Sequence, residues 1–276
     1  MWALDVLEGA LGTWNSYMAE IWSIVTVSPK EFQGGAVWPA MEQIFSILQG
    51  IGYGLLILFF AMSFFKHTAS FRELRHPEQV FRLFIRFVLA QTAITYALDI
   101  INFIFEITGG ITSAIATRMG ALNEITAQLP DEIRQAAEEA NILESAFVSL
   151  VGLLFSGLVL CLSLAMIYQI YGRFFRVYLY VAIAPLPLAA FGGEMTSRHG
   201  RTYIQSFIAV CLEAAIAVIA CIIFSQLSSS ILPPSVFGDG SIGMMIGYMV
   251  GVGFQMTVLL GIIKMADHFV KEMLAI

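Results

Sequence analysis

The sequence predicts an all-α, polytopic membrane protein, and its composition is the first reason. The chain is 58% hydrophobic and 12% charged, with a mean hydropathy of +0.81, whereas soluble domains carry about 25% charged residues. Several apolar runs reach the roughly 20 residues that a helix needs to cross a bilayer. We therefore predict five transmembrane helices, one Pro-broken segment that re-enters the membrane or lies at its interface, and an N-terminal amphipathic helix.

The N-terminal region, residues 1–43, is expected to be an amphipathic helix and a linker on the outer side of the membrane. Asp5, Glu8 and Glu20 interrupt its first 25 residues, so this stretch is not a span. The acids also make it unlike a secretory signal, which begins with basic residues. Apolar residues recur at helical spacing, which favours a helix at a membrane interface or against a partner: Leu4, Leu7, Leu11, Trp14, Met18, Ile21, Trp22 and Val25.

The transmembrane domain is expected to cover residues 44–276. A polar segment, residues 106–145, separates the second and third apolar runs. It is read as an outside loop of two helices broken at Leu129-Pro130, with Asp131 placed to cap the second helix. The predicted spans are residues 44–65, 83–105, 146–171, 203–227 and 242–263.

The segment 174–191 reads "FFRVYLYVAIAPLPLAAF". Pro185 and Pro187 each lack a backbone donor, and proline disfavours helical geometry in the residue before it. We therefore expect a helix over residues 173–184, a break, and a return of the chain, so that both ends lie on the same side. Broken backbone at membrane depth requires burial by protein or a wet cavity. A kinked sixth span is the alternative.

The distribution of basic residues favours the re-entrant interpretation, because Lys and Arg in short loops mark the cytoplasmic side. Five spans place the N-terminus outside and the C-terminus in the cytoplasm, with Lys30, Arg118 and Arg134 outside. A sixth span would scatter the remaining basic residues over both sides. With five spans those residues all face the cytoplasm: Lys66, Arg72, Arg75, Arg82, Arg86, Arg173, Arg176, Arg198, Arg201, Lys264 and Lys271.

No motif indicates catalysis, and we expect no enzyme activity, cofactor or metal site. The chain has neither GxxxxGK[ST] nor HExxH, and its histidines are scattered. Two acids lie inside predicted spans, Asp99 and Glu213. An ionised group at the bilayer centre costs about 3 kcal/mol. Glu213 should therefore face a protein interior, a subunit interface or a pore, or be a buried carboxyl bonded to Gln169 or a serine.

Two further patterns indicate contacts. In "GMMIGYMVGVG", Gly243, Gly247 and Gly251 share one helix face and permit close helix packing, within the chain or between subunits. The loop "FKHTASFRELRHPEQVFRLFIR" is basic with interleaved aromatic residues. Its charges favour anionic phospholipid headgroups as an orientation signal, and a cytoplasmic ATPase or DNA are the other candidates.

The chain resembles the TrbL-type polytopic channel subunits of type IV secretion systems, in the versions carried by conjugative elements of Gram-positive bacteria. The resemblance runs from about Trp38 to Lys264. Its most distinctive stretches are "FKHTASFRELRHPEQVFRLFIRFVLAQTAITYALD" and "VYLYVAIAPLPLAAFGGEMTSRHGRTYIQSF".

The resemblance implies a subunit of the bacterial plasma membrane that forms an oligomeric ring, typically a pentamer. Such subunits lack catalytic residues, act with other secretion subunits and with cytoplasmic ATPases, and help to pass relaxase-bound single-stranded DNA or protein. Pro185 and Pro187 would then mark the re-entrant break, and Arg173, Arg176, Arg198 and Arg201 a basic cytoplasmic ring. A secondary transporter and a purely structural assembly platform are the alternatives.

Overall fold

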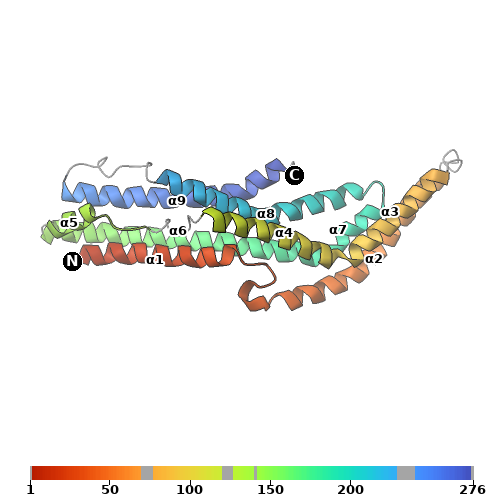
Figure 1. The fold of residues 1–276 in the computed structure, drawn as a ribbon, viewed down its shortest axis with the longest axis horizontal. Coiled ribbons are helices and arrows are strands. Elements are labelled where there is room, and N and C mark those ends of the chain that lie inside the picture. The colour runs from red at the N-terminus through yellow and green to blue at the C-terminus, as the bar shows by residue number, and fades with distance from the viewer. Residues whose placement is uncertain (1, 70–76, 120–126, 140–141, 229–239, 275–276) are drawn as a thin grey trace. The chain divides into compact units, whose positions relative to one another are not determined.

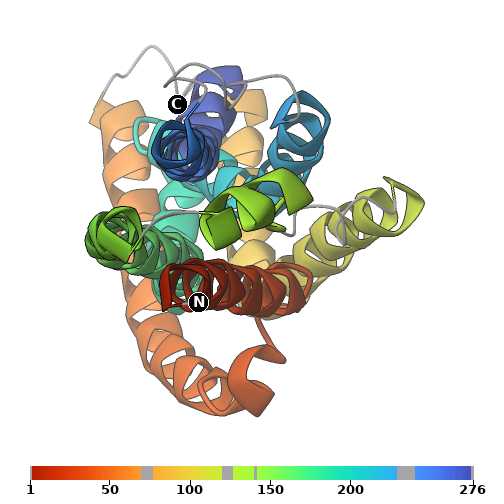
Figure 2. The same cartoon turned by 90° about the vertical axis from the view of Figure 1, so that its left-hand side faces the viewer.

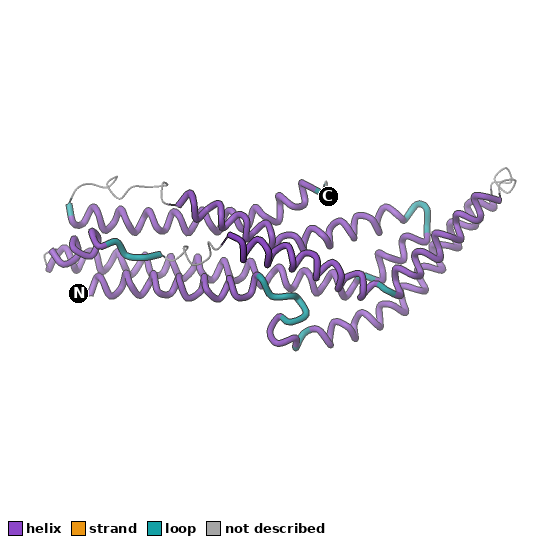
Figure 3. Tube along the Cα trace, in the orientation of Figure 1, coloured by secondary structure: helices purple, strands orange, loops and turns teal. Residues whose placement is uncertain are grey.

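The computed structural model describes residues 2–69, 77–119, 127–139, 142–228 and 240–274. These residues form helices and no strand, which confirms the all-α prediction (Figure 3). The chain forms two compact units. Unit 1 comprises residues 1–26, 111–172 and 214–268, and unit 2 comprises residues 27–110, 173–213 and 269–276.

Helix α1 (Trp2–Val25) contributes its apolar stripe to the interior of unit 1. Leu7, Trp14 and Met18 are buried, and Val6 contacts Gly152 of α6 (Ile142–Ile183). The predicted amphipathic helix therefore exists, and its own chain covers much of its apolar face. The end view shows α1 beside α5 (Asp131–Glu139) and α6 (Figure 2).

Polar contacts join α1 to α5 and to Ala127 within unit 1. Arg134 of α5 pairs with Glu8 of α1 at 2.8 Å. The Asn15 side chain both donates to the Ala127 carbonyl and accepts from its amide, each at 2.9 Å. The helix α5 begins at Asp131, directly after the predicted break at Pro130. Of the rest of the predicted outside loop, residues 106–119 extend α4 (Ala97–Met119) and residues 142–145 begin α6, while residues 120–126 and 140–141 lie outside the described residues.

Unit 2 is built on an antiparallel pair, α2 (Trp38–Ala69) and α3 (Pro77–Thr95) (Figure 1). Near the connection between them, Phe60 packs against Phe84 and Phe87. Farther along, the hydroxyls of Tyr53 and Thr95 are 2.9 Å apart. Trp38, at the other end of α2, packs edge-on against Phe105 of α4.

Five helices of the described chain are long and apolar enough to cross a membrane, which confirms the predicted number. They contain most of the predicted ranges, with one exception discussed next. Their apolar parts are Trp38–Lys66, Ala97–Thr117, Ser145–Ile183, Ser197–Phe224 and Ile242–Met273, in α2, α4, α6, α8 (Ser197–Ser228) and α9 (Ser241–Met273).

The exception is the predicted second span, 83–105, which is divided between α3 and α4. The hydroxyls of Thr92 and Thr95 donate to carbonyls four residues earlier, both at 2.9 Å, and such back-bonding bends helices. In addition, Gln49 of α2 donates to the Ile94 carbonyl at 3.1 Å. The side chains thus compete with the main-chain ladder where the helix breaks.

The predicted boundary between the third span, 146–171, and the segment at 174 is also wrong, because α6 is continuous. It has 42 residues, about 63 Å at 1.5 Å per residue, against a hydrocarbon core of roughly 30 Å. The strongest breaker near the expected boundary is Gly172, and glycine costs a helix only about 1 kcal/mol. The helix ends at Ile183, one residue before Ala184-Pro185.

Candidate functional site

The Pro-broken segment of unit 2 follows α2 along its length. Before the break, Phe174 stacks on Phe32, with ring centroids 3.9 Å apart, and the Tyr178 hydroxyl donates to the Pro29 carbonyl at 2.8 Å. These contacts lie just before the start of α2. The segment therefore enters unit 2 at the N-terminal end of α2.

After the break, the contacts move steadily toward the C-terminal end of α2. Pro185 lies against Gly52. Then Gly192 meets Leu56 and Gly193 meets Phe59, the Glu194 amide donates to the Ser63 hydroxyl at 3.2 Å, and Lys66 Nζ lies 3.4 Å from Met195 Sδ. Residues 174–195 thus run parallel to α2 from one end to the other.

This path corrects the expected return of the chain within residues 174–191. Ala184 keeps helical φ and ψ angles, and Pro185 is the first residue of α7 (Pro185–Ala189), where a missing N–H removes no helical bond. The prolines therefore end one helix and begin another in place of reversing the chain. The reversal lies after η4 (Ala190–Gly192), where the Ser197 amide donates to the Gly193 carbonyl at 3.1 Å.

Glu213 of α8 lies in a charge pair that the sequence did not predict. Arg176 of α6 donates through Nη2 to both carboxylate oxygens, at 2.7 and 2.8 Å. The Glu213 side chain is 5% exposed and that of Arg176 is 32% exposed. Glu213 is thus buried within unit 2, and its partner is a basic residue that the sequence analysis placed at the cytoplasmic surface.

The four arginines of the predicted basic ring do not gather at one place. Arg173 is buried, with its guanidinium 4.7 Å from the centroid of the Phe174 ring. Arg173 and Arg176 therefore lie near the Phe32 end of unit 2. Arg198 and Arg201 are exposed at the start of α8, which follows Met195 at the Lys66 end.

The other predicted positions are dispersed. Asp99 is exposed in the first turn of α4, where an acid suits the helix dipole. In α9, Gly247 and Gly251 are buried and Gly243 is half-buried. Whether this glycine face also contacts another subunit stays a prediction.

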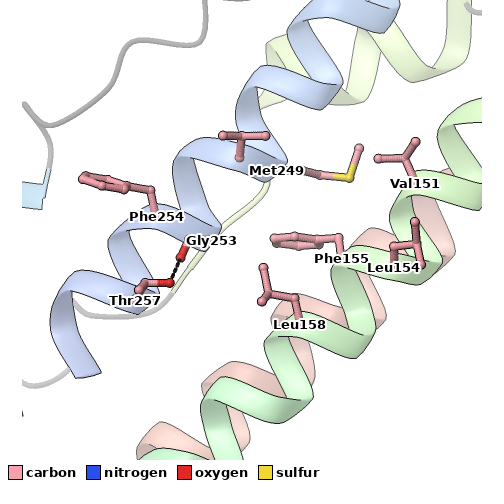
Figure 4. Close-up of a pocket in the computed structure, with 9 residues that line it drawn as sticks. Val151, Leu154, Phe155, Leu158, Met249, Gly253, Phe254 and Thr257 are labelled. Carbon is pink, nitrogen blue, oxygen red and sulfur yellow. Dashed lines mark hydrogen bonds between the residues drawn. The ribbon is translucent and has the colours of Figure 1, made fainter. Parts of the chain in front are cut away.

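A groove between α6 and α9 of unit 1 has a volume of about 410 Å³ (Figure 4). Phe155 and Leu158 face Gly253 across it, and the Thr257 hydroxyl donates to the Gly253 carbonyl within its own helix. The lining offers no acid, base or thiol nucleophile, so it supports no acid–base chemistry. Among the described residues no cluster of His, Cys, Asp or Glu could hold a metal ion. The lining is Val151, Leu154, Phe155, Leu158, Met249, Val250, Gly253, Phe254 and Thr257.

Comparison with known protein families identifies a family for this chain. Residues 14–185 match the family described as TrbL/VirB6 plasmid conjugal transfer like protein, and this match covers more than half of the chain. The chain belongs to this family. As a TrbL/VirB6 protein with five candidate spans, it is a multi-pass membrane component of a conjugative type IV secretion machine. The comparisons with curated proteins and with solved structures gave no match.

The family match and the resemblance noted from the sequence overlap but differ in extent. The match includes the second half of α1, which the resemblance had left out, and it ends at Pro185. All of helix α6, with Arg173 and Arg176, is thus within the matched region, whereas Glu213, Arg198 and Arg201 lie beyond it.

Proposed function

We propose that this TrbL/VirB6 protein is a channel or scaffold subunit of an oligomeric ring, through which the secretion machine passes its substrate. Both units expose large apolar side chains, such as Ile47 of α2 and Leu154 and Tyr168 of α6, which are 68%, 70% and 78% exposed. Lipid and neighbouring copies of the chain are the natural cover for such faces in a membrane. A pentamer is the ring size implied by the resemblance.

The observation that carries the proposal is the basic end of unit 2, in a member of a conjugal-transfer family. Lys66 and Arg86 lie beside Met195 and Glu194, with Arg86 3.4 Å from Glu194. The positive-inside rule places this end in the cytoplasm. The described basic residues that we assign to it are Lys66, Arg82, Arg86, Arg198 and Arg201.

This orientation retains five crossings, with the N-terminus outside and the C-terminus in the cytoplasm. Residues 174–195 run the length of α2, so we propose that the third crossing, in α6, continues through this segment to the Lys66 end. Arg173 and Arg176 then belong to the outer half of the bundle, where Glu213 neutralises one of them.

At the cytoplasmic end, the exposed Arg198 and Arg201 offer two charges to a polyanion. Phosphates of single-stranded DNA and of lipid headgroups attract the same guanidinium groups, and binding of either weakens as salt rises. We propose that relaxase-bound DNA meets the ring here, next to the cytoplasmic ATPases that supply energy.

Two other functions remain alternatives. Secondary transporters often carry broken helices at corresponding positions in two halves. In the part of the chain that the structure describes, the Pro-Leu-Pro break has no second copy, which weighs against transport. A structural platform for other secretion subunits differs only in that the substrate does not touch the chain.

A pair of charge reversals tests the proposal. Arg198→Glu with Arg201→Glu should lower conjugation frequency at least tenfold, while membrane insertion and oligomer size stay unchanged. Arg198→Lys with Arg201→Lys, which keeps the charge, should retain transfer. Reversal of Arg72 and Arg75, which lie outside the described residues, should have a smaller effect. Equal losses from both reversals, or failed insertion, would show that these charges serve orientation alone.

A further inference from the structure

Two cations and one anion meet where α6 and α8 cross in unit 2. Arg173 and Arg176 are three residues apart on α6 and so occupy one helix face. Glu213 of α8 is bonded to Arg176. Within the described residues Arg173 has no hydrogen bond or ion pair, although 92% of its surface is covered, since its exposed fraction is 8%.

A buried cation without a hydrogen-bonded anion is costly, and an apolar side chain of similar size would be tolerated better. The ring of Phe174, itself stacked on Phe32, offsets part of this cost. The carboxylate of Glu213 also attracts Arg173 across the helix interface. Arg173 is therefore a second partner for a carboxylate that Arg176 already holds.

The connection between α6 and α8 is interrupted, so the two helices are not parts of one continuous helix. It consists of the short helices α7 and η4 and an extended turn at Gly193, not of one rigid rod. Besides the charge pair, the hydrogen bond from the Tyr203 hydroxyl to the Tyr180 carbonyl, 2.6 Å long, joins the two helices. Both contacts show that α8 runs antiparallel to the end of α6.

We propose that Glu213 exchanges Arg176 for Arg173 when α8 slides along α6, so that unit 2 has two charge-paired states. Three residues of helix correspond to a shift of about 4.5 Å. Helices in switching proteins ratchet past one another by steps of this kind. The structure shows one of these states, in which Arg176 pairs with Glu213 and the Tyr203 hydroxyl donates to the Tyr180 carbonyl. This proposal goes beyond the proposed role in transfer and does not require it.

The exchange can be measured as a distance in the purified full-length protein. Nitroxide labels at Phe175→Cys and His199→Cys report the shift, since both side chains are exposed and lie at opposite ends of the paired region. The native thiols are first removed by Cys161→Ser, Cys211→Ala and Cys221→Ala. Double electron–electron resonance should give a main distance and a second one shorter by about 4 Å.

Single substitutions should then select one state. Arg173→Gln should abolish the shorter distance, and Arg176→Gln should make it the main one. Arg173→Lys, which keeps the cation, should retain both distances. If Arg176→Gln does not yield folded protein, Tyr203→Phe serves in its place. This substitution removes the hydrogen bond to the Tyr180 carbonyl and so weakens only the state with Arg176 paired. It should therefore enlarge the population at the shorter distance. A single distance that is the same in the starting protein, in Arg173→Gln and in Tyr203→Phe would overturn the proposal.

Discussion

The carbonyl oxygen of Pro185 lies so close to Gly52 that a β-carbon on that glycine would stand 2.9 Å from it. This contact holds the Pro-broken segment against the middle of α2. It joins residues far apart in the sequence through main-chain atoms, which cannot yield as a flexible side chain can. The position of the break therefore depends on a glycine in another helix.

Replacing Gly52 should displace the segment. We expect Gly52→Leu to lower the stability of the detergent-solubilised protein by at least the 1–3 kcal/mol typical of overpacking. Gly54→Leu is the matched control, because Gly54 is an exposed glycine of the same helix with no atom within 4 Å of an added β-carbon. Thermal unfolding followed by circular dichroism makes the comparison. Equal melting temperatures for both variants would refute the close contact.

The charge pair should be asymmetric in its response to mutation. Removing one partner of a buried pair typically costs about 3–5 kcal/mol. Glu213→Gln removes the carboxylate from both arginines, of which Arg173 is buried, whereas Arg176→Gln leaves Arg173 available to Glu213. We therefore expect Glu213→Gln to unfold at a lower temperature than Arg176→Gln. The reverse order in thermal unfolding would show that Arg173 is not an available partner.

The path of residues 174–195 predicts where thiol reagents reach the chain in cells. In a background without native cysteines, Phe175→Cys should react with an impermeant reagent added from outside. Arg198→Cys should react only after the cells are permeabilised, because it lies at the basic end of unit 2. Labelling of neither position from outside would instead favour a segment that dips in from the cytoplasm and returns.

The glycine face of α9 gives a further prediction. Gly247 and Gly251 are buried, so Gly247→Leu with Gly251→Leu should lower stability by forcing the backbones apart. Gly261→Leu, on the same helix with no atom within 4 Å of an added β-carbon, should have a smaller effect. Light scattering then shows whether the proposed oligomer also depends on this face. Full stability in the double variant would mean that no close helix contact exists there.

Composition was sufficient to predict the helical class, the number of apolar helices and the amphipathic α1, because each depends on local hydrophobic pattern. Composition and local pattern did not predict the features that depend on contacts between distant parts of the chain. In the sequence, Arg173 and Arg176 look like the charges that follow the end of a span. In the structure both lie within the continuous helix α6, where Glu213 pairs with Arg176. The break between α3 and α4 depends partly on Gln49 of another helix.

The Pro-Leu-Pro break shows the same limit. The sequence indicates that a helix ends near Pro185, but the direction of the chain after the break depends on the φ and ψ angles of Ala184. Those angles are helical, and the glycines at positions 52, 192 and 193 let the following residues lie close to α2. No local pattern distinguishes this arrangement from a return of the chain.

The most direct test of the proposed role is to trap the transferred strand during conjugation and ask whether it is bound to this chain. A photoreactive amino acid at Thr202, an exposed position beside Arg201, should crosslink to single-stranded DNA in mating cells. The crosslink should persist in Arg198→Lys with Arg201→Lys and disappear in the corresponding Glu variants. Recovery of the strand on other secretion subunits, with none on this chain at Thr202 or at Lys66, would contradict a channel role.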